Sequence, residues 1–460
     1  MSEPVLRAYR KAWEATIVHA LDEISFMPPD MFFQIEKRSG TGKRKEHSLM
    51  GGLCTLLSGD FLQLPPVEGS SLARPLDEKG FFVDASSQDK KIERDERHGS
   101  KTKEERDNRE RRDEECRGGF ALWRNQCRSV TNLSLNMRTT QPLAGILSGM
   151  RNKKMTDESW RSLEDRLLGC RRSGNGGMKP LPPGELDDRL SQPPFVNNPV
   201  VYIVHRHKLR ACQSYRNAVK SCVALREPLY LSVARDETTS ANEQYFTDEV
   251  RRQLLEKANL RHVKNLPGTL VLYRGLRLLL QKKICVQLSL VNGCECILED
   301  IVFSDDERLP EHAFAGALIV LEYMPTRLLL RAVGAQWVLP SVHLPHLPDG
   351  YDRKGLFLLK PHYDELTEGL PCKVLRTHFP IVPADVRIVH SAQGEGFEAN
   401  IVDMAKPPTM GPEEHWLSNY VMISRASSLE GLLILRLPSR ADMTRGSRHL
   451  YANRGIRKGY

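Results

Sequence analysis

Short apolar runs that contain β-branched residues constrain the fold of this chain more than any other feature of the sequence. Runs of this length and composition are typical of buried strands. Helical stretches at 143–150 and 247–259 separate some of them, which favours an α/β architecture with parallel sheets. The runs lie at 53–57, 200–204, 269–272, 317–321, 401–402 and 432–435.

Three segments depart from this pattern. Residues 85–119 are mostly Lys, Arg, Glu and Asp, so we expect them to contribute nothing to a core. Their oppositely charged i,i+4 pairs allow a solvated helix that is polar on every side, and we interpret the segment as a surface insertion. Residues 171–194 are rich in Gly and Pro, which predicts a loop or linker. Between about 270 and 374 strand runs occur with few helical stretches, which predicts a small β-rich module.

Composition and charge exclude some classes of protein. The 460 residues suggest about three domains. No apolar stretch reaches the roughly 18 residues that a membrane span needs. The N-terminus lacks an apolar secretion signal, so we expect a protein that is not secreted and ten Cys without disulfides. Lys plus Arg (67) exceed Asp plus Glu (58) by 9, a surplus that permits a polyanionic partner such as nucleic acid.

Two segments carry residues suited to nucleotide chemistry. The apolar segment 17–27 contains adjacent carboxylates, Asp22 and Glu23; Asp can hold Mg²⁺ while Glu orients a water molecule. By itself such a pair more often consists of two turn carboxylates. The run at 53–57 leads into Gly-Asp-Phe-Leu-Gln-Leu-Pro-Pro-Val, where Gly59 allows a tight exit and Gln63 offers an amide to a phosphate or a water.

In this order the segments 21–25 and 59–67 resemble motifs II and III of the PIF (petite integration frequency) family of superfamily-one DNA helicases, relatives of RecD. The later motifs follow in the family's order. Residues 133–138 resemble motif IV, with Thr139 where the family usually has Gln. The Leu-Val-Asn-Gly segment at 290–293 is similar to the family segment that leads into an SH3-like insertion.

The remaining motifs lie near the C-terminus. Val-His-Ser-Ala-Gln-Gly at 389–394 resembles motif V, with Ser391 in place of the usual Lys and Ala392 in place of the usual Ser. Residues 420–425, followed by 429–432, look like motif VI. Together the resembling segments extend over most of the chain.

The resemblance implies an α/β fold: a RecA-like P-loop NTPase helicase core, its first domain truncated, with a small SH3-like β-barrel insertion. It implies ATP-dependent translocation on DNA and unwinding, with ATP and Mg²⁺ as cofactors. Single-stranded DNA and duplex junctions would be the partners, and no membrane would be involved. The implied roles are DNA repair, recombination or telomere maintenance, in the nucleus or mitochondrion.

The resemblance also implies domain boundaries. The end of the first RecA-like domain would occupy 1–130, with the charged insertion at about 86–118. The second RecA-like domain would occupy 131–275 together with 376–437. The SH3-like insertion would occupy 276–375, and a basic tail would follow at 438–460.

The family's mechanism assigns roles to individual residues. Asp22 would bind Mg²⁺ and Glu23 would position the hydrolytic water. Gln63 would sense the γ-phosphate, while Arg138 and Arg425 would neutralise the charge that develops on it. The other implied contacts are Gly59, Asp60, Gln393 and Gly394 with nucleotide, and His390, Ser391 and Asn292 with DNA.

One element of such a helicase has no counterpart in the sequence. A phosphate-binding loop, G-x-x-x-x-G-K-[ST], should precede Asp22, but the chain contains none. Gly40-Thr41-Gly42-Lys43 imitates the end of such a loop, yet it follows Asp22 and precedes Arg44, so we interpret it as a basic turn. We expect the N-terminal part of the first RecA-like domain to be absent from this chain.

Three explanations remain open for this missing loop: an incomplete helicase, a catalytically inactive nucleic-acid-binding remnant, or a helicase domain from a mobile element. Other candidate sites are weaker. Cys294-x-Cys296 and His205-x-His207 each lack a spaced second pair, so we expect no zinc site.

Overall fold

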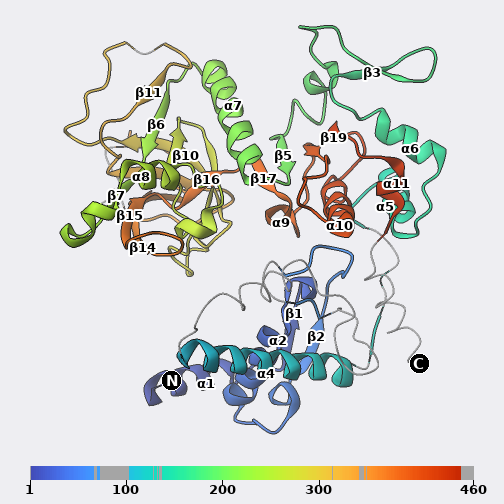
Figure 1. The fold of residues 1–460 in the computed structure, drawn as a ribbon, viewed down its shortest axis with the longest axis vertical. Helices are drawn as coiled ribbons and strands as arrows, with labels where there is room; N and C mark the ends of the chain where they lie inside the picture. Colours follow the sequence, from blue (N-terminus) through green and yellow to red (C-terminus); the bar gives the residue numbers. More distant parts are fainter. Residues whose placement is uncertain are drawn as a thin grey trace. The chain divides into compact units, whose positions relative to one another are not determined.

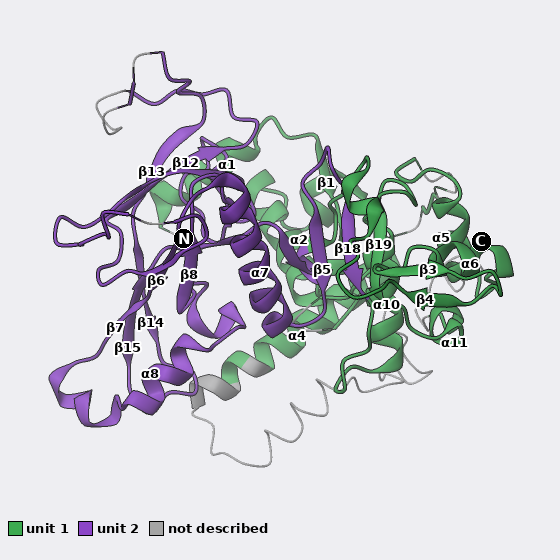
Figure 2. Cartoon of the chain, turned by 90° about the horizontal axis from the view of Figure 1, so that it is seen from above, with its two compact units in different colours: residues 1–194, 392–398, 404–460 green, residues 195–391, 399–403 purple. Residues whose placement is uncertain are grey.

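The computed structural model describes residues 2–66, 70–72, 103–127, 129–131, 133, 137–312, 314–340, 347–348 and 350–446. The described chain mixes helices with short strands, as the sequence predicts (Figure 1). It divides into two compact units, shown in different colours in Figure 2. Unit 1 comprises Met1–Pro194, Ala392–Glu398 and Met404–Tyr460, and unit 2 comprises Phe195–Ser391 and Ala399–Asp403.

Some sequence predictions fall outside the described residues. These are the first part of the charged insertion (86–102), the centre of motif IV (134–136), Val67, and the end of the basic tail (447–460). The three predicted domains and the basic tail stay a prediction. Each helix of the described part is too short or too polar to cross a membrane.

A two-stranded parallel sheet opens unit 1. Strand β1 (Val18–Leu21) pairs with β2 (Cys54–Leu57), which confirms a strand at 53–57. We expected the run at 53–57 to be buried, and this is wrong, because the residues of β1 and β2 alternate between exposed and half-buried; Leu56, for example, is 63% exposed. Among the described residues no further strand joins this sheet, so alternate side chains face solvent.

Helix α4 (Lys103–Gln126) lies along α2 (Pro29–Lys43) (Figure 1). Gln34 Nε2 of α2 donates a hydrogen bond of 2.9 Å to Glu115 of α4, and Phe120 is buried. The described end of the charged segment therefore packs against α2 at Gly119, whereas the buried apolar residue Phe120 lies just beyond the segment 85–119. Gly119 explains the close approach, because a Cβ there would overlap the carbonyl oxygen of Pro29.

This contact yields a stability prediction. Alanine normally stabilises a helix interior by up to about 1 kcal/mol over glycine. Gly119→Ala should instead lower the free energy of unfolding, by about 1–3 kcal/mol, because the new methyl group must push α2 and α4 apart. Thermal and denaturant unfolding measure the change.

Gly145 supplies the matched control. It lies exposed in helix α5 (Leu143–Arg151), where a Cβ would meet only the flexible end of Gln141 at 3.2 Å. Gly145→Ala should leave stability unchanged or raise it. Equal effects of the two substitutions would show that α4 does not pack on α2 as described.

The rest of unit 1 consists of helices around a buried α10 (Pro412–Ile423). A hairpin of β3 (Cys170–Arg172) and β4 (Met178–Pro180) lies where we expected a loop, so that expectation is partly wrong. Short-range backbone pairing there outweighs the Gly and Pro content. The other elements of unit 1 are α1 (Glu3–Trp13), η1 (Ile24–Phe26), η2 (Leu49–Gly52), α6 (Asp157–Glu164), η3 (Asp188–Ser191), β19 (Leu432–Arg436) and α11 (Arg440–Thr444).

Unit 2 contains a parallel sheet followed by a long helix. Strand β5 (Val201–Val204) lies between β17 (Val386–Ile388) and β18 (Asn400–Asp403) and runs parallel to both. Helix α7 (His207–Leu225) begins shortly after β5 ends. This arrangement confirms the α/β prediction. Since the strands are parallel, the ends of β5 and β17 meet at one edge of the sheet.

The remainder of unit 2 is mainly β-structure. A five-stranded sheet has the order β13-β12-β10-β9-β16, antiparallel throughout. The described residues between 270 and 374 hold strands and turns, as predicted, whereas the SH3-like barrel stays a prediction.

The strands of this part of unit 2 are β6 (Leu229–Val233), β7 (Arg235–Glu237), β8 (Thr269–Leu272), β9 (Arg277–Leu280), β10 (Glu295–Val302), β11 (Leu318–Val320), β12 (Arg327–Ala332), β13 (Leu356–Leu359), β14 (His362–Leu366), β15 (Val374–His378) and β16 (Ile381–Pro383). The helical elements beside α7 are η4 (Ser240–Tyr245), α8 (Asp248–Leu255), η5 (Leu260–Val263) and α9 (Val389–Ala392), whose last residue belongs to unit 1.

Candidate functional site

Asp22 follows directly on strand β1, where its carboxylate is fixed by two donors. Ser58 Oγ donates a hydrogen bond of 2.6 Å to Asp22 Oδ1, and the Glu23 backbone N–H donates another of 2.9 Å. These bonds, Ser58 first, lower the pKa of Asp22, and the nearby Arg138 lowers it further. Asp22 is therefore an exposed, ionised carboxylate at neutral pH.

Glu23 has a left-handed backbone, with φ 52° and ψ 45°. A residue with a side chain adopts this conformation at a cost of about 1–2 kcal/mol. Backbone bonds of 2.9 Å from Ile24 N to Ser58 O and from Ser58 N to Leu21 O hold the turn. Gly59 is required beside it, because a Cβ there would lie 2.7 Å from Ile24 N.

The side chain of Gln393 connects the turn after β1, which carries Glu23, with the segment after β2, which carries Leu64. Its Nε2 donates to Glu23 Oε2 at 3.2 Å and to Ser25 Oγ at 3.3 Å, while its Oε1 accepts from Leu64 N at 3.1 Å. The neighbouring Gly394 has φ 83°, and a Cβ there would lie 3.6 Å from Glu23 Oε1. Motif II, motif III and the Gln393-Gly394 end of motif V thus meet inside unit 1, although they are far apart in the sequence.

Gln63 lies in a turn after β2 that Asp60 stabilises. Gln63 N donates to the Asp60 carbonyl at 2.9 Å, and Leu62 N donates to Asp60 Oδ1 at 3.0 Å. The side-chain oxygen of Gln63 is buried, and within the described part of the chain it has no hydrogen-bond partner. Since an unpaired buried oxygen costs about 1–3 kcal/mol, this position suits a side chain that pairs with a ligand or a water.

Two arginines complete the unit 1 cluster. Arg425 is 1% exposed, and its guanidinium donates to Glu395 O at 2.9 Å and to Val421 O at 3.2 Å. Arg138 Nη2 donates to Gly394 O at 3.4 Å. Burial lowers the pKa of Arg425 to about 10, and the positive charge of Arg138 acts in the same direction. An anionic phosphate would relieve this repulsion and would match the fork of donors.

Sequence reasoning missed Arg151, at the end of α5. Its guanidinium forms an ion pair with Asp60, and its Nε donates to Tyr420 Oη at 2.7 Å. Burial alone would lower the pKa of Arg151, but Tyr420 and Asp60 together raise it. Asp60, which we expected to contact nucleotide, is thus held by protein. Nothing in the sequence marks Arg151, because its partners lie 91 and 269 residues away.

The three predicted DNA-binding residues belong to unit 2 and are not members of the unit 1 cluster. Ser391 is exposed, and its Oγ accepts from Ile388 N at 3.1 Å and donates to Ile388 O at 2.9 Å. His390 is half-buried, and Asn292 is exposed in the turn before β10.

The residues present fit one Mg²⁺ ion. No group of three or more His, Cys, Asp or Glu with metal-binding geometry occurs among the described residues. Mg²⁺ does not require one, since it commonly binds one or two carboxylates and completes its shell with water and phosphate oxygens. Asp22, ionised and next to the Ser58 hydroxyl, offers such a carboxylate.

Two other features carry no site. The segment Gly40–Lys43, expected as a basic turn, forms the last turn of α2, and Lys43 Nζ donates to the backbone oxygens of Trp13, Glu14 and Thr16.

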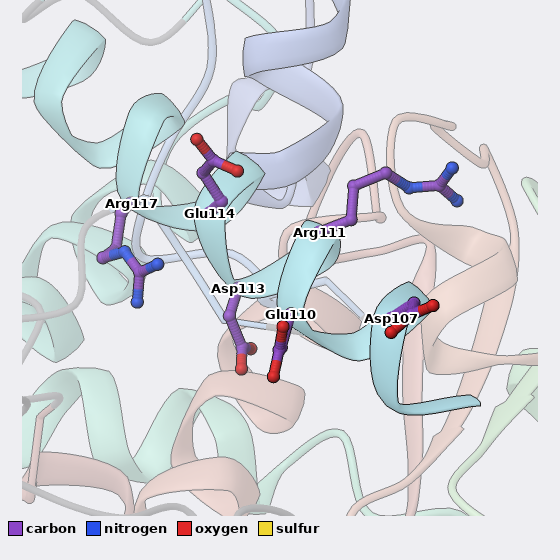
Figure 3. A pocket seen from close by; sticks show the side chains of 6 residues that line it. All are labelled: Asp107, Glu110, Arg111, Asp113, Glu114 and Arg117. Atoms are coloured by element: carbon purple, nitrogen blue, oxygen red, sulfur yellow. The ribbon is translucent and has the colours of Figure 1, made fainter. Parts of the chain in front are cut away.

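Figure 3 shows a hollow that, among the described residues, is lined by side chains of α4 alone. Its lining consists of Asp107, Glu110, Arg111, Asp113, Glu114 and Arg117. A single polar helix face does not enclose a ligand.

No known family model matches the chain, and no curated protein sequence matches it. Its fold is similar to solved structures. The Pif1 helicase from Candida albicans is 16% identical, with a TM-score of 0.53 over 99% of this chain and 81% of that chain. Pif1 from Bacteroides in complex with ADP-AlF3 and ssDNA is 15% identical, with a TM-score of 0.54 over 100% of this chain and 78% of that chain.

These likenesses define the class of fold. The chain has a mixed α/β, RecA-like fold. Within that class its fold is that of the Pif1 helicases, which confirms the resemblance found in the sequence.

Proposed function

We propose that this protein is an ATP-dependent DNA helicase that couples ATP hydrolysis to translocation on DNA and to unwinding. The observation that carries the proposal is the unit 1 cluster. In this cluster Gln393 forms hydrogen bonds with Glu23 and Leu64. Arg425 and Arg138 lie near the turn that carries Glu23. The Bacteroides Pif1 complex with ADP-AlF3 and ssDNA supports both the nucleotide and the DNA in this proposal.

The chemistry of the cluster suits phosphoryl transfer. Asp22 would hold Mg²⁺, which neutralises phosphate charge when bound. Glu23, fixed by Gln393, would orient the attacking water, and the unpaired oxygen of Gln63 would hydrogen-bond to that water. Arg425 and Arg138 would stabilise the charge that develops on the γ-phosphate, and they cost little reorganisation because they are already in place.

For the printed residues taken alone, a second candidate function is nucleic-acid binding without ATP turnover. It is favoured by one observation, that the printed sequence contains no G-x-x-x-x-G-K-[ST] segment. Both candidates require binding of a DNA strand. We place the biological role in DNA repair, recombination or telomere maintenance.

Single-stranded DNA should bind the chain in the absence of nucleotide. Backbone contacts should dominate, because a translocating protein must accept any base sequence. The logarithm of the affinity should then fall linearly with the logarithm of salt concentration, by about 0.7 for each neutralised phosphate. Fluorescence anisotropy titrations at several salt concentrations test this.

Ser391→Lys provides a matched variant, since the family usually has Lys at this position. It should tighten binding and steepen the salt slope by about 0.7, whereas Ser240→Lys, at an exposed site of the same unit, should change the slope less. Absence of affinity at low salt, or an affinity indifferent to salt, would refute the DNA-binding assignment.

A further inference from the structure

Strand β11 lies at the edge of a small sheet in unit 2. The sheet has the order β11-β6-β8, and β11 runs parallel to β6 (Figure 1). Among the described residues no strand pairs with the other side of β11. We propose that this outer edge binds an extended, basic segment of a partner protein, which adds a strand to the sheet. Such binding requires neither DNA nor ATP hydrolysis, so it goes beyond the proposed function.

The backbone of β11 directs hydrogen-bonding groups to its outer side. Ala317 O accepts a hydrogen bond of 2.8 Å from β6, and Leu321 N donates one of 3.0 Å to β6. Alternate residues of a strand bond to the same neighbour, so the N–H and C=O groups of Leu318 and Val320 point away from β6. A row of such groups at a sheet edge matches the backbone of another extended segment.

Apolar side chains lie exposed along the same edge. Leu318 is 45% exposed and Val320 is 61% exposed. Leu318 pairs in register with Leu229, which shares a buried core with residues of α7, so Leu318 and Val320 lie on the α7 side of the sheet. The exposed Val223 of α7 continues this surface, because a Cβ on Gly316, just before β11, would lie 2.7 Å from Val223 Cγ2. The edge therefore offers an apolar face to alternate side chains of an added strand.

Carboxylates accompany this edge. Residues 305–322 contain five carboxylates and one arginine. The carboxylate of Glu307 lies at the end of β11, where it accepts hydrogen bonds from Glu322 N at 3.3 Å and from Tyr323 N at 2.7 Å. The other four carboxylates are exposed and belong to Asp305, Asp306, Glu311 and Glu322. Within the described part of the chain none of the five forms an ion pair, so the edge favours a cationic partner.

These features together select one kind of occupant. A nucleic-acid strand would bring phosphates, which the carboxylates repel. A second copy of this chain would bring the same carboxylates to the edge. A helix already satisfies its own backbone groups and cannot pair with β11. An extended segment in which Lys or Arg alternates with Val, Leu or Ile supplies the backbone partners, the apolar side chains and the positive charge.

A labelled peptide, acetyl-Lys-Val-Lys-Val-Lys-Val-Lys amide, is a suitable probe for the whole chain. Fluorescence anisotropy should show that this peptide binds. The same peptide with Glu in place of Lys should not bind, and neither should the Lys peptide with its backbone N–H groups methylated. Hydrogen exchange resolved to single amides should show slower exchange of Leu318 and Val320 in the complex, because both amides gain acceptors there.

Two substitutions of Val320 test the edge directly. Val320→Pro removes an outward N–H and leaves the bonds between β11 and β6 in place, a position where strands tolerate proline. It should weaken peptide binding by about tenfold or more. Val320→Lys keeps the backbone intact and sets a positive charge against the cationic peptide, so it should also weaken binding even if proline disturbs the fold. Val286→Lys, at another exposed valine of unit 2, is the matched control and should leave affinity nearly unchanged.

A charge variant tests the basic character of the partner. Glu322→Gln should weaken binding of the Lys peptide by about two- to fivefold and should reduce its dependence on salt. Glu368→Gln changes a more exposed carboxylate of the same unit, which lies 3.8 Å from Nδ1 of His262. It should leave both the affinity and the salt dependence nearly unchanged.

The opposing outcomes are distinct. Absence of binding at up to about 1 mM Lys peptide would overturn the inference. Equal binding of the Glu peptide, or an affinity that Val320→Pro and Val320→Lys both leave unchanged, would also overturn it. Sedimentation of the chain alone tests the second copy as occupant. Self-association that Val320→Lys abolishes would show that β11 pairs with its counterpart, and the assignment to a basic partner would be wrong.

Discussion

ATP hydrolysis by the printed 460 residues should be very slow, far below the roughly 1–100 per second of typical phosphoryl-transfer enzymes. In the proposed mechanism the unit 1 cluster would supply groups for the γ-phosphate and the attacking water. The sequence contains no lysine-bearing phosphate loop to hold the β- and γ-phosphates, and without one ATP is not positioned against the cluster. Steady-state assays with and without single-stranded DNA measure the rate.

A fusion provides the matched control for this prediction. When the first part of a RecA-like domain, with its G-x-x-x-x-G-K-[ST] loop, is joined upstream of the chain, DNA-stimulated hydrolysis should appear. The same fusion with the loop Lys changed to Ala should remain inactive. DNA-stimulated turnover near 1–100 per second by the printed chain alone would contradict the prediction.

The sequence predicted those parts of the fold that depend on local pattern. Short apolar runs identified strands such as β5 and β19, because a buried strand needs several apolar residues in succession. The resemblance also selected residues that the structure places together, among them Glu23, Gln393 and Arg425. Residue types in a fixed order were sufficient here, because each motif is a short continuous segment.

Contacts between distant segments could not be predicted in this way. The packing of α4 on α2 depends on Gly119 and on apolar residues near it, whereas the composition of the segment is dominated by charge. The ion pair of Arg151 with Asp60 joins residues that no motif connects. The left-handed backbone of Glu23 depends on hydrogen bonds with Ser58, which tertiary structure alone provides.

Arg425→Ala should abolish most ATP hydrolysis in a fusion that supplies the phosphate loop. The expected loss in turnover number is about 10³-fold or more, while nucleotide affinity should change much less. Arg425 is nearly fully buried and already charged, so its guanidinium can stabilise the transition state without reorganisation. Turnover number and nucleotide affinity, measured separately, distinguish this role from simple binding.

Three further variants show whether the loss is chemical or structural. Arg425 donates to the carbonyls of Glu395 and Val421, so its removal also costs some stability. Arg425→Lys keeps the charge but not the planar fork, and should recover only part of the turnover. Arg440→Ala removes an arginine of the same unit that pairs with Asp157 at 2.6 Å, and it should leave turnover unchanged. Arg138→Ala should also lower the turnover number, as Arg425→Ala does.

An unchanged turnover number in Arg425→Ala, with the fusion folded and nucleotide bound, would show that this arginine does not act on the γ-phosphate.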